Sequence, residues 1–267
     1  MTELRIITPS APLHSGPTTD ASLDNEGLFG ETFKVTGTKN GFLFGSLIAD
    51  GYEGWIPKNC LGDLPVPNAR VIAPMTHVTL RASVKSPSCF SLSFRAVVNV
   101  INTKGDRAKI ATAAGHAFLP RRHIQLLVDA KKRPGAENEL VDIDWVGFAE
   151  RLINAPYKWG GRTAWGLDCS ALVQLSLAAA GLDVPRDSGP QHEIGAHLNI
   201  ESCLSKSNLR RGDLVFWQGH VGIMQDHHRL LHANAYHMAV VSEPLEDAVT
   251  RISPIAGPIT ALRRPIF

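Results

Sequence analysis

The sequence predicts an α+β domain that follows two small β-barrels. The first 128 residues consist of short apolar runs separated by turn dipeptides, a pattern typical of small all-β domains. From residue 138 onward the apolar residues take helical spacing, and after residue 210 the strand pattern returns. A helical part followed by a strand-rich part within one segment favours the α+β class.

The composition limits the possible functions. Hydrophobic residues make up 44% of the 267 residues, which supports a sizeable core and excludes a largely disordered chain. The 27 Lys and Arg residues against 25 Asp and Glu leave a net charge of +2, so nucleic acid and anionic membranes are not expected partners. No apolar run approaches the ~20 residues that span a bilayer.

The chain start and the cysteines favour a reducing compartment. The first residues lack a basic stretch followed by an apolar one, so we expect no secretory signal and a cytoplasmic location. The four cysteines are too few and too scattered for a disulfide framework. Three of them, Cys60, Cys89 and Cys203, are expected to be ordinary apolar residues.

The first predicted barrel covers residues 1–66. Asn40-Gly41 and Asp50-Gly51 are hairpin-type turn dipeptides between its apolar runs. A Pro-Val-Pro sequence then ends the pattern. The predicted strands include 33–35, 42–44 and 54–56.

The second predicted barrel covers residues 67–128 and shows weak similarity to the first. Residues 54–61 and 116–124 both contain an aromatic strand, a proline, a short polar turn and an aliphatic residue. This repetition at a period of roughly 60 residues suggests two barrels of one type. The turn 104–106 separates two of the predicted strands, which are 70–73, 96–101 and 107–111.

A charged linker with Pro and Gly, residues 129–137, precedes the α+β domain at 138–267. Helices are expected over 141–153 and 169–180, and Gly181 stands where a C-cap glycine is favoured. The predicted strands of this domain are 213–217, 220–224, 229–233, 238–242 and 257–263.

Cys169 stands at the start of the longer predicted helix. Backbone N–H groups and the helix dipole at this end favour an anion, so we expect a lowered pKa for the Cys169 thiol. Because the thiolate is the nucleophilic form of cysteine, this position suits attack on a carbonyl carbon.

Two histidines can complete a catalytic group with Cys169. His220 opens one predicted strand and His232 lies on the next, and the turn 226–228 makes the two strands a hairpin. A hairpin can place both rings on one face, so that His220 acts as the base and His232 holds its tautomer. Tyr157, in a Gly-rich turn before the nucleophile, can donate to a developing oxyanion.

Residues 155–191 resemble the core of the NlpC/P60 family of cysteine peptidases. The matching motifs are a Tyr-x-Trp-Gly-Gly turn, an Asp-Cys-Ser sequence heading a helix, and an Arg-Asp-Ser run that ends in Gln. The family's Gly-Asp-Leu-x-Phe-Trp and Gly-His-Val-Gly-Ile strands follow at 212–217 and 219–223. The resemblance implies a papain-like catalytic domain in which Cys169 is the nucleophile, His220 the base and His232 the third polar residue. It also assigns Tyr157 to the oxyanion.

The front half resembles bacterial SH3 (SH3b) domains over residues 27–61 and, more distantly, over 70–127. The second copy has Ala117-Phe118 in place of Gly-Trp, so it is given no ligand role. Two SH3b-like domains ahead of an NlpC/P60 domain resemble the γ-D-glutamyl-L-diamino acid endopeptidases of the dipeptidyl-peptidase VI type. The resemblance implies hydrolysis of the γ-D-glutamyl-diamino acid bond in murein stem peptides with a free N-terminal L-Ala, during recycling of cell-wall peptides.

The same resemblance implies six substrate-binding residues. Glu31, Tyr52 and Asp168 would hold the L-Ala ammonium, since carboxylates and a phenol select a free amine through charge-assisted hydrogen bonds. Ser170, Asp187 and Ser188 would line the pocket for L-Ala-γ-D-Glu. A core role for Tyr52 and a capping role for Asp187 are the alternatives. No Cys-x-x-Cys pair is present, so neither a metal nor another cofactor is expected.

The sequence is also compatible with two other functions. One is an endopeptidase or amidase that acts on intact peptidoglycan and does not need a free amine on its substrate. The other is a non-catalytic protein that binds wall fragments, which the joint presence of Cys169, His220 and His232 disfavours. The preference for diaminopimelate or lysine and the oligomeric state are also open.

Overall fold

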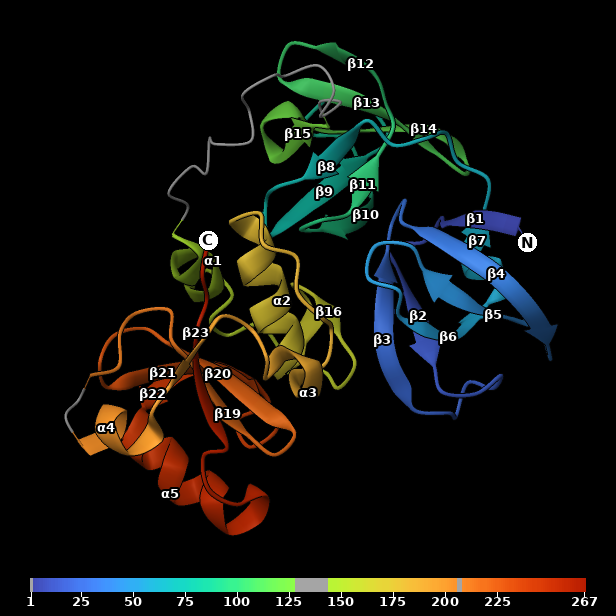
Figure 1. Ribbon diagram of the computed structural model, residues 1–267. Coiled ribbons are helices and arrows are strands. Elements are labelled where there is room, and N and C mark those ends of the chain that lie inside the picture. The colour runs from blue at the N-terminus through green and yellow to red at the C-terminus, as the bar shows by residue number, and fades with distance from the viewer. Residues whose placement is uncertain (1, 128–143, 206–207) are drawn as a thin grey trace. The chain divides into compact units, whose positions relative to one another are not determined.

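The computed structural model describes residues 2–127, 144–205 and 208–267 (Figure 1). These residues divide into two compact units. The first unit holds the described residues up to 127 together with Gly160–Ala164, and the second holds the remainder. The predicted linker 129–137 lies outside the described residues. Within the described part of the chain, no helix has the length and apolar character needed to cross a bilayer.

The first unit begins with a seven-stranded antiparallel sheet, in the order β3-β2-β6-β5-β4-β1-β7. Asn40 and Gly41 both have positive φ, at 51° and 80°, and they form the predicted two-residue turn between β4 and β5. A buried cluster that includes Ile6, Phe33 and Ile56 forms its core, with Tyr52 packed against it. The elements are β1 (Thr2–Ile6), β2 (Ser10–His14), β3 (Leu23–Leu28), β4 (Thr32–Lys39), β5 (Phe42–Leu47), β6 (Glu53–Pro57), the 3-10 helix η1 (Lys58–Cys60) and β7 (Leu61–Gly62).

The following segment forms a five-stranded sheet, β10-β9-β14-β13-β12, and a three-stranded sheet, β11-β8-β15. The prediction of one strand over 96–101 is wrong, because the chain changes sheets at Asn99. The Asn68 side chain bonds both backbone groups of Val100, at 2.7 and 3.0 Å, which holds the break in place. The elements are β8 (Ala69–Val71), β9 (Met75–Thr79), β10 (Ser88–Ser93), β11 (Val97–Val98), β12 (Val100–Lys104), β13 (Arg107–Thr112), β14 (Gly115–Pro120), η2 (Arg121–His123) and β15 (Ile124–Leu126); β16 (Arg162–Thr163) also belongs to this unit.

The two sequence segments of the first unit end in the same local structure. In each, a strand runs into a proline, Pro57 or Pro120, that precedes a three-residue 3-10 helix and a short strand. This agrees with the similarity between 54–61 and 116–124. The description of 67–128 as a second SH3-like barrel stays a prediction.

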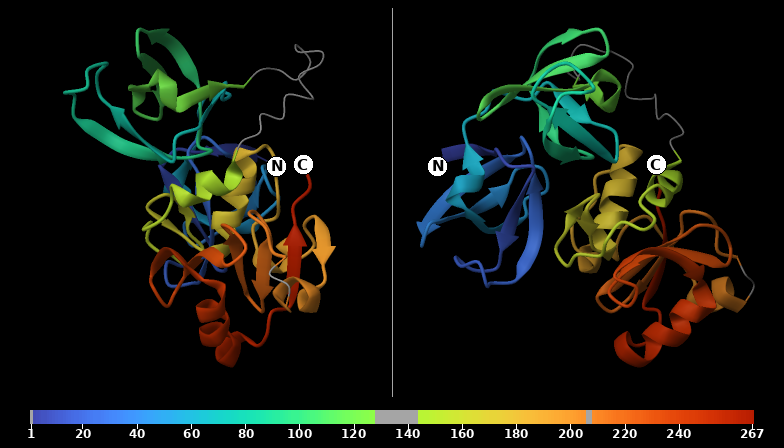
Figure 2. Two further views of the ribbon diagram at one scale, coloured as in Figure 1. Left: turned by 90° about the vertical axis from the view of Figure 1, so that its left-hand side faces the viewer. Right: turned by 180° about the vertical axis from the view of Figure 1, so that it is seen from behind.

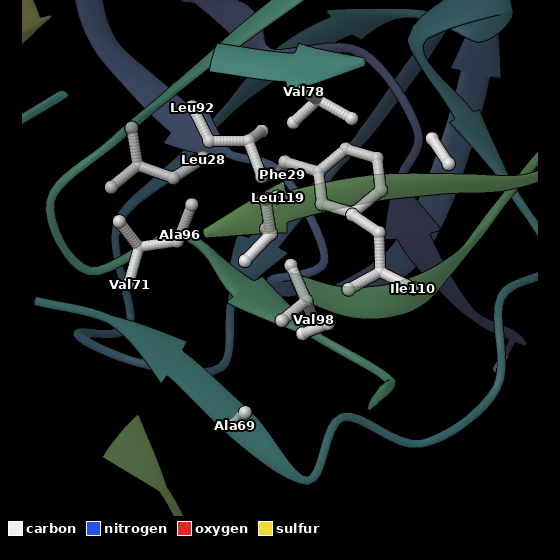
Figure 3. Close-up of a cluster of buried hydrophobic side chains, with 12 residues drawn as sticks. Leu28, Phe29, Ala69, Val71, Val78, Leu92, Ala96, Val98, Ile110 and Leu119 are labelled. Carbon is white, nitrogen blue, oxygen red and sulfur yellow. The ribbon is translucent and has the colours of Figure 1, made fainter. Parts of the chain in front are cut away.

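Both segments contribute to one hydrophobic core. Leu28 and Phe29, at the end of β3, lie among the buried side chains of the second segment (Figure 3). The Phe29 ring stacks on Phe90 with centroids 5.9 Å apart. Gly30, at φ +79°, lies so close to Val97 that an added Cβ would come within 1.9 Å of its carbonyl oxygen. The shared core explains why the two segments form a single unit.

The second unit is built on a six-stranded sheet in the order β18-β23-β19-β20-β21-β22. Helices α2 and α5 lie on opposite sides of this sheet (Figure 1, Figure 2). The elements are α1 (Trp145–Glu150), β17 (Gly166–Leu167), α2 (Cys169–Ala179), α3 (Ser188–Gln191), β18 (Ala196–Leu198), α4 (Ile200–Ser205), β19 (Leu214–Trp217), β20 (His220–Met224), β21 (Arg229–Asn234), β22 (Ala239–Pro244), α5 (Leu245–Ala256) and β23 (Ala261–Arg264).

Helix α2 begins at the predicted residue, ends one residue before the predicted end, and is closed by the predicted glycine. Gly181 adopts φ +84°, its N–H donates to Ala178, and the N–H of Leu182 donates to Leu177. These two bonds form the Schellman motif, in which a left-handed glycine closes the helix. All residues from Cys169 to Ala178 are buried, which makes α2 the central helix of the unit.

Helix α5 is a feature that the sequence interpretation missed. Leu245, Ala248 and Ile252 have helical spacing and pack on the sheet, but Pro254 in the last turn obscures the pattern. Because α5 continues to Ala256 and Gly257 ends it at φ +77°, the last strand begins at Ala261, later than predicted.

Candidate active site

Cys169 is the first residue of α2 and is buried, with 7% of its surface exposed. Asp168 caps the helix, and its side chain accepts a hydrogen bond of 2.9 Å from the N–H of Ala171. An aspartate in this position satisfies one of the free N–H groups of the first turn. The cap therefore fixes the end of the helix at which the thiol lies.

The Cys169 sulfur lies beside the beginning of β20. The backbone N–H groups of Val221 and Ser170 both hydrogen bond to it. Strand β20 pairs with β21 through Ile223 and Met224, so the Val221 end of β20 is outside this ladder. The separation of the two strands leaves the Val221 N–H for the thiol, so Cys169 contacts the residue that follows His220.

His220 and His232 form a hydrogen-bonded pair across the same gap. His220 Nε2 lies 2.8 Å from His232 Nδ1. His232 is fully buried, whereas His220 is partly exposed and its ring lies 5.8 Å from that of Trp217. The structure thus brings together the two histidines that the sequence paired. This bond uses Nε2 of His220, so the other ring nitrogen of His220, Nδ1, takes no part in it.

A carboxylate that sequence reasoning missed lies behind His232. Glu243 Oε1 is 2.6 Å from His232 Nε2, and the same carboxylate is ion-paired with Arg251 of α5. Glu243 pairs with Leu230 in the β21–β22 ladder and is therefore a diagonal neighbour of His232. No motif surrounds Glu243 in the sequence, and only the strand register and α5 reveal its position.

The expectation of a lowered pKa for the Cys169 thiol is wrong. Burial raises the pKa of Cys169 to about 12, and the negative charge of Asp168 adds to this effect, against the opposing N–H bonds and Arg186. Burial also lowers the pKa of His220, to about 3. Both shifts favour a neutral thiol beside a neutral imidazole. In this state the proton must leave the sulfur as it attacks.

Tyr157 is positioned by its backbone next to the nucleophile. Its N–H donates to Met238 at 2.9 Å, and it forms a bridge with Leu167, two residues before Cys169. Burial, together with the charges of Cys169 and Asp168, raises the pKa of Tyr157 to about 12. The phenol therefore keeps its proton and can act as a hydrogen-bond donor.

Asp168 and Ser170 share a buried arginine. Arg186 donates two hydrogen bonds to the Asp168 carboxylate, at 2.9 and 2.6 Å, and one to Ser170 Oγ at 2.8 Å. Such a bidentate pair is the geometry in which arginine binds a carboxylate most firmly. Both predicted binding residues thus lie together at the start of α2. The negative charge of Asp168 is balanced by the Arg186 guanidinium.

The other predicted pocket residues precede α3. Asp187 is exposed and its backbone oxygen accepts from Gln191, while Ser188 is the first residue of the helix and is partly buried. The Gln191 side chain donates to the backbone oxygens of Ser170, at 2.9 Å, and Pro185. Gln191 therefore ties α3 to the first turn of α2.

Glu31 and Tyr52 belong to the first unit. Glu31 is buried, with one oxygen 2.5 Å from Arg162 and the other accepting from the Leu28 N–H. Tyr52 is partly buried at the margin of the first core. The core alternative for Tyr52 is thus compatible with its position, and the ammonium-binding role of both residues stays a prediction.

One group among the described residues has potential metal-ligand atoms close together. The ligand atoms of Asp226, His227 and His228 all lie within 4.8 Å of one another in the turn after β20. Asp226 already accepts from the N–H groups of His228 and Arg229, as a turn aspartate commonly does. The expectation that the chain needs no metal stays a prediction.

Comparison with known protein families finds one match in each unit. Residues 154–252 match the model of the NlpC/P60 family, a range that includes Tyr157, Cys169, His220, His232 and Glu243. The chain contains an NlpC/P60 domain. Residues 13–61 match the model of the bacterial dipeptidyl-peptidase SH3 domain. The order of an SH3 domain followed by the NlpC/P60 domain agrees with the expected one.

Two relatives of the chain carry the names of peptidases. The chain is 24% identical over 232 residues to the gamma-D-glutamyl-L-lysine dipeptidyl-peptidase of Bacillus subtilis, covering 80% of this chain and 70% of that protein. It is 35% identical over 105 residues to the murein DD-endopeptidase MepS/murein LD-carboxypeptidase of Escherichia coli, covering 37% of this chain and 49% of that protein. At the level of the family, the chain is a hydrolase of the NlpC/P60 type.

The fold is shared with a solved relative along the whole chain. The crystal structure of an NlpC/P60 family protein from Bacillus cereus superposes with a TM-score of 0.77 at 19% identity. The match covers 98% of this chain and 99% of that one. This likeness concerns the fold alone.

Proposed function

We propose that the protein is a cysteine endopeptidase that hydrolyses the bond between γ-D-Glu and a diamino acid in murein stem peptides with a free N-terminal L-Ala. The observation that carries the proposal is the hydrogen-bonded pair of His220 and His232 beside Cys169 at the start of α2. A nucleophile, a base and a residue that orients the base are the three parts that acyl transfer by a cysteine enzyme needs.

The reaction begins with a neutral pair. His220 takes the proton of the Cys169 thiol as the sulfur attacks the carbonyl carbon, and a tetrahedral oxyanion forms. The His220 imidazolium then protonates the amine of the diamino acid, the C–N bond breaks and a thioester remains. Water, deprotonated by His220, hydrolyses the thioester and releases L-Ala-D-Glu with the thiol restored.

Tyr157 supports the oxyanion in this proposal. Its phenol keeps its proton because burial raises its pKa to about 12, and it lies close enough to Cys169 for the thiolate charge to contribute to that shift. A neutral donor next to the developing charge stabilises the transition state more than the substrate.

The substrate class is supported by the relative from Bacillus subtilis, whose name is gamma-D-glutamyl-L-lysine dipeptidyl-peptidase. Selection of the free amine by Glu31, Tyr52 and Asp168 and pocket roles for Ser170, Asp187 and Ser188 are part of the proposal. A carboxylate accepts about four hydrogen bonds. Glu31 accepts from the Leu28 N–H and Arg162 and has room for an ammonium, whereas an ammonium at Asp168 would have to replace one of the four bonds from Ala171, Ser170 and Arg186. Recycling in the cytoplasm and an SH3-like fold of 67–128 also remain proposals.

Mass spectrometry of model peptides tests the proposal. L-Ala-γ-D-Glu-diaminopimelate, its lysine analogue and their N-acetylated forms are incubated with the wild type, Cys169→Ala and a Cys89→Ala control at an exposed cysteine. We expect L-Ala-D-Glu from the free-amine peptides with the wild type and the control only. Cleavage of the acetylated peptides as well would refute amine selection and favour an enzyme of intact peptidoglycan. Cleavage by Cys169→Ala would refute cysteine catalysis.

A further inference from the structure

The catalytic histidines belong to a longer chain of hydrogen bonds. It runs from His220 through His232 and Glu243 to Arg251, and therefore joins β20, β21, β22 and α5. His232 is fully buried, so its two ring nitrogens depend on these protein partners rather than on solvent. The far end of the chain is an ion pair, which can impose a direction on every bond in it.

We propose that Glu243 is a positioning residue that holds His232 in the tautomer required for His220 to act as the base. The inference rests on the proposed function, in which His220 removes the proton of Cys169. Glu243 itself touches neither the nucleophile nor the ring of His220.

The direction of each bond follows from the charge of Glu243. An ionised carboxylate can only accept hydrogen bonds, and the guanidinium of Arg251 keeps this one ionised. His232 Nε2, at 2.6 Å from that carboxylate, must therefore carry a hydrogen. In a neutral ring His232 Nδ1 is then the acceptor, and His220 Nε2 must donate to it across 2.8 Å. This leaves His220 Nδ1 without a proton, free to receive that of Cys169.

The other polar groups around His232 do not reverse this direction. The Asn234 amide nitrogen lies 3.0 Å from His232 Nε2, while the Asn234 oxygen accepts from the backbone N–H of His237. If Asn234 donated to Nε2, two acceptors would face each other at 2.6 Å, which the charge of Glu243 forbids. His237 and Arg251 are the other titratable groups that act on the charge of His232, His220 bonds to its Nδ1, and none of the three accepts from Nε2.

Removing the acceptor at position 243 is expected to reverse these bonds. Arg251 and His232 Nε2 share one oxygen of Glu243, Oε1, so in Glu243→Gln a single amide oxygen can accept from both and keep the wild-type directions. In Glu243→Leu no acceptor oxygen remains at this position, and the Asn234 amide nitrogen, 3.0 Å from His232 Nε2, becomes the donor to it. Nε2 would then be the acceptor, His232 Nδ1 the donor, and His220 Nδ1 would carry the proton. The base would be blocked in the neutral enzyme, although nothing near Cys169 had changed.

The experiment compares Glu243→Leu and Glu243→Gln with Glu246→Leu, a control at an exposed glutamate in the first turn of α5. The ¹⁵N spectrum of labelled histidine reports the tautomers of His220 and His232 without any substrate. Single histidine variants assign the signals. The kcat and KM for the free-amine peptide are measured on the same proteins.

For Glu243→Leu we expect the two tautomers to be exchanged and kcat to fall roughly 10- to 100-fold, with KM little changed. Glu243→Gln keeps an acceptor oxygen, so we expect the wild-type tautomers and most of the activity, and the control should match the wild type. Wild-type tautomers in a folded Glu243→Leu protein would overturn the inference. If this variant does not fold, loss of the wild-type tautomers in Glu243→Gln would overturn it. Failure of the proposed function would instead leave the spectra as expected and every protein inactive on the peptide.

Discussion

At the scale of single residues, burial shifts the pKa values of the thiol and phenol in one direction and that of the imidazole in the other. The thiol of Cys169 and the phenol of Tyr157 both have pKa values raised to about 12, while that of His220 is lowered to about 3. A buried site disfavours every charged form, so the resting enzyme keeps all three groups neutral. Charge then appears only during the reaction, where Tyr157 and the N–H groups near the sulfur can stabilise it.

Tyr157→Phe tests the role of the phenol. Because only a hydroxyl group is removed, we expect kcat to fall about 100-fold while KM for the free-amine peptide changes little. Tyr236→Phe is the matched control, since Tyr236 is 72% exposed and packs against Arg251 away from the nucleophile. A rise in KM at constant kcat would instead assign Tyr157 to substrate binding.

At the scale of elements, the segment between Tyr157 and the nucleophile depends on the first unit. Gly160–Ala164 groups with that unit, although the sequence placed these residues within 138–267. The contacts of Arg162 explain why this segment groups with the first unit. It is buried, its N–H donates to Glu26 at 2.9 Å, and its guanidinium pairs with Glu31 at 2.5 Å. Gly160, at φ +68°, packs so closely that a Cβ would come within 2.5 Å of Leu23 O.

Breaking the buried pair at one end should destabilise the first unit. Glu31→Gln leaves the buried Arg162 guanidinium with the Asp50 carboxylate, 3.9 Å away, as its nearest counter-charge, and we expect a loss of about 3 kcal/mol in the free energy of unfolding. Glu31→Gln combined with Arg162→Met should recover much of this loss, because neither charge then remains buried. Urea unfolding measures the cycle, and Glu53→Gln at an exposed strand position is the control. Additive effects of the two substitutions would contradict a direct pairing.

At the scale of the whole molecule, the buried histidines should make stability depend on pH. Burial lowers the pKa values of both His220 and His232 below the ordinary value of 6.5. Below pH 6.5 the unfolded chain therefore binds more protons than the folded one, so the free energy of unfolding falls as the pH falls. The pKa values of Glu150 and Glu243 are lowered from 4.5, so their contribution is lost only at more acidic pH.

Urea unfolding at pH 7 and pH 5 measures this dependence. We expect the free energy of unfolding to be lower at pH 5 by about 2 kcal/mol for each of the two histidines that stays neutral in the folded protein, since one proton taken up over one pH unit is worth about 1.4 kcal/mol. His232→Gln should reduce the difference between the two pH values, whereas His197→Gln, at an exposed strand residue, should leave it unchanged. An equal difference in all three proteins would rule out His232 as a source.

The sequence by itself determined the elements whose causes are local. The Asn40-Gly41 turn, the Gly181 helix end and the His220–Met224 strand depend on neighbouring residues, and each lies where it was predicted. The pairing of His220 with His232 was also within reach, because a hairpin turn and the alternation of strands suffice to place them on one face.

Only the tertiary structure decided the contacts that join distant parts of the chain. Glu243 reaches His232 because of a strand register and is held by Arg251 of a helix that the sequence reading missed. Arg162 pairs with Glu31, 131 residues earlier. The pKa of Cys169 is raised rather than lowered because burial outweighs the helix end, and burial is a property of the packed fold. Local spacing carries no information on any of these, since each depends on which surfaces meet after the chain has folded.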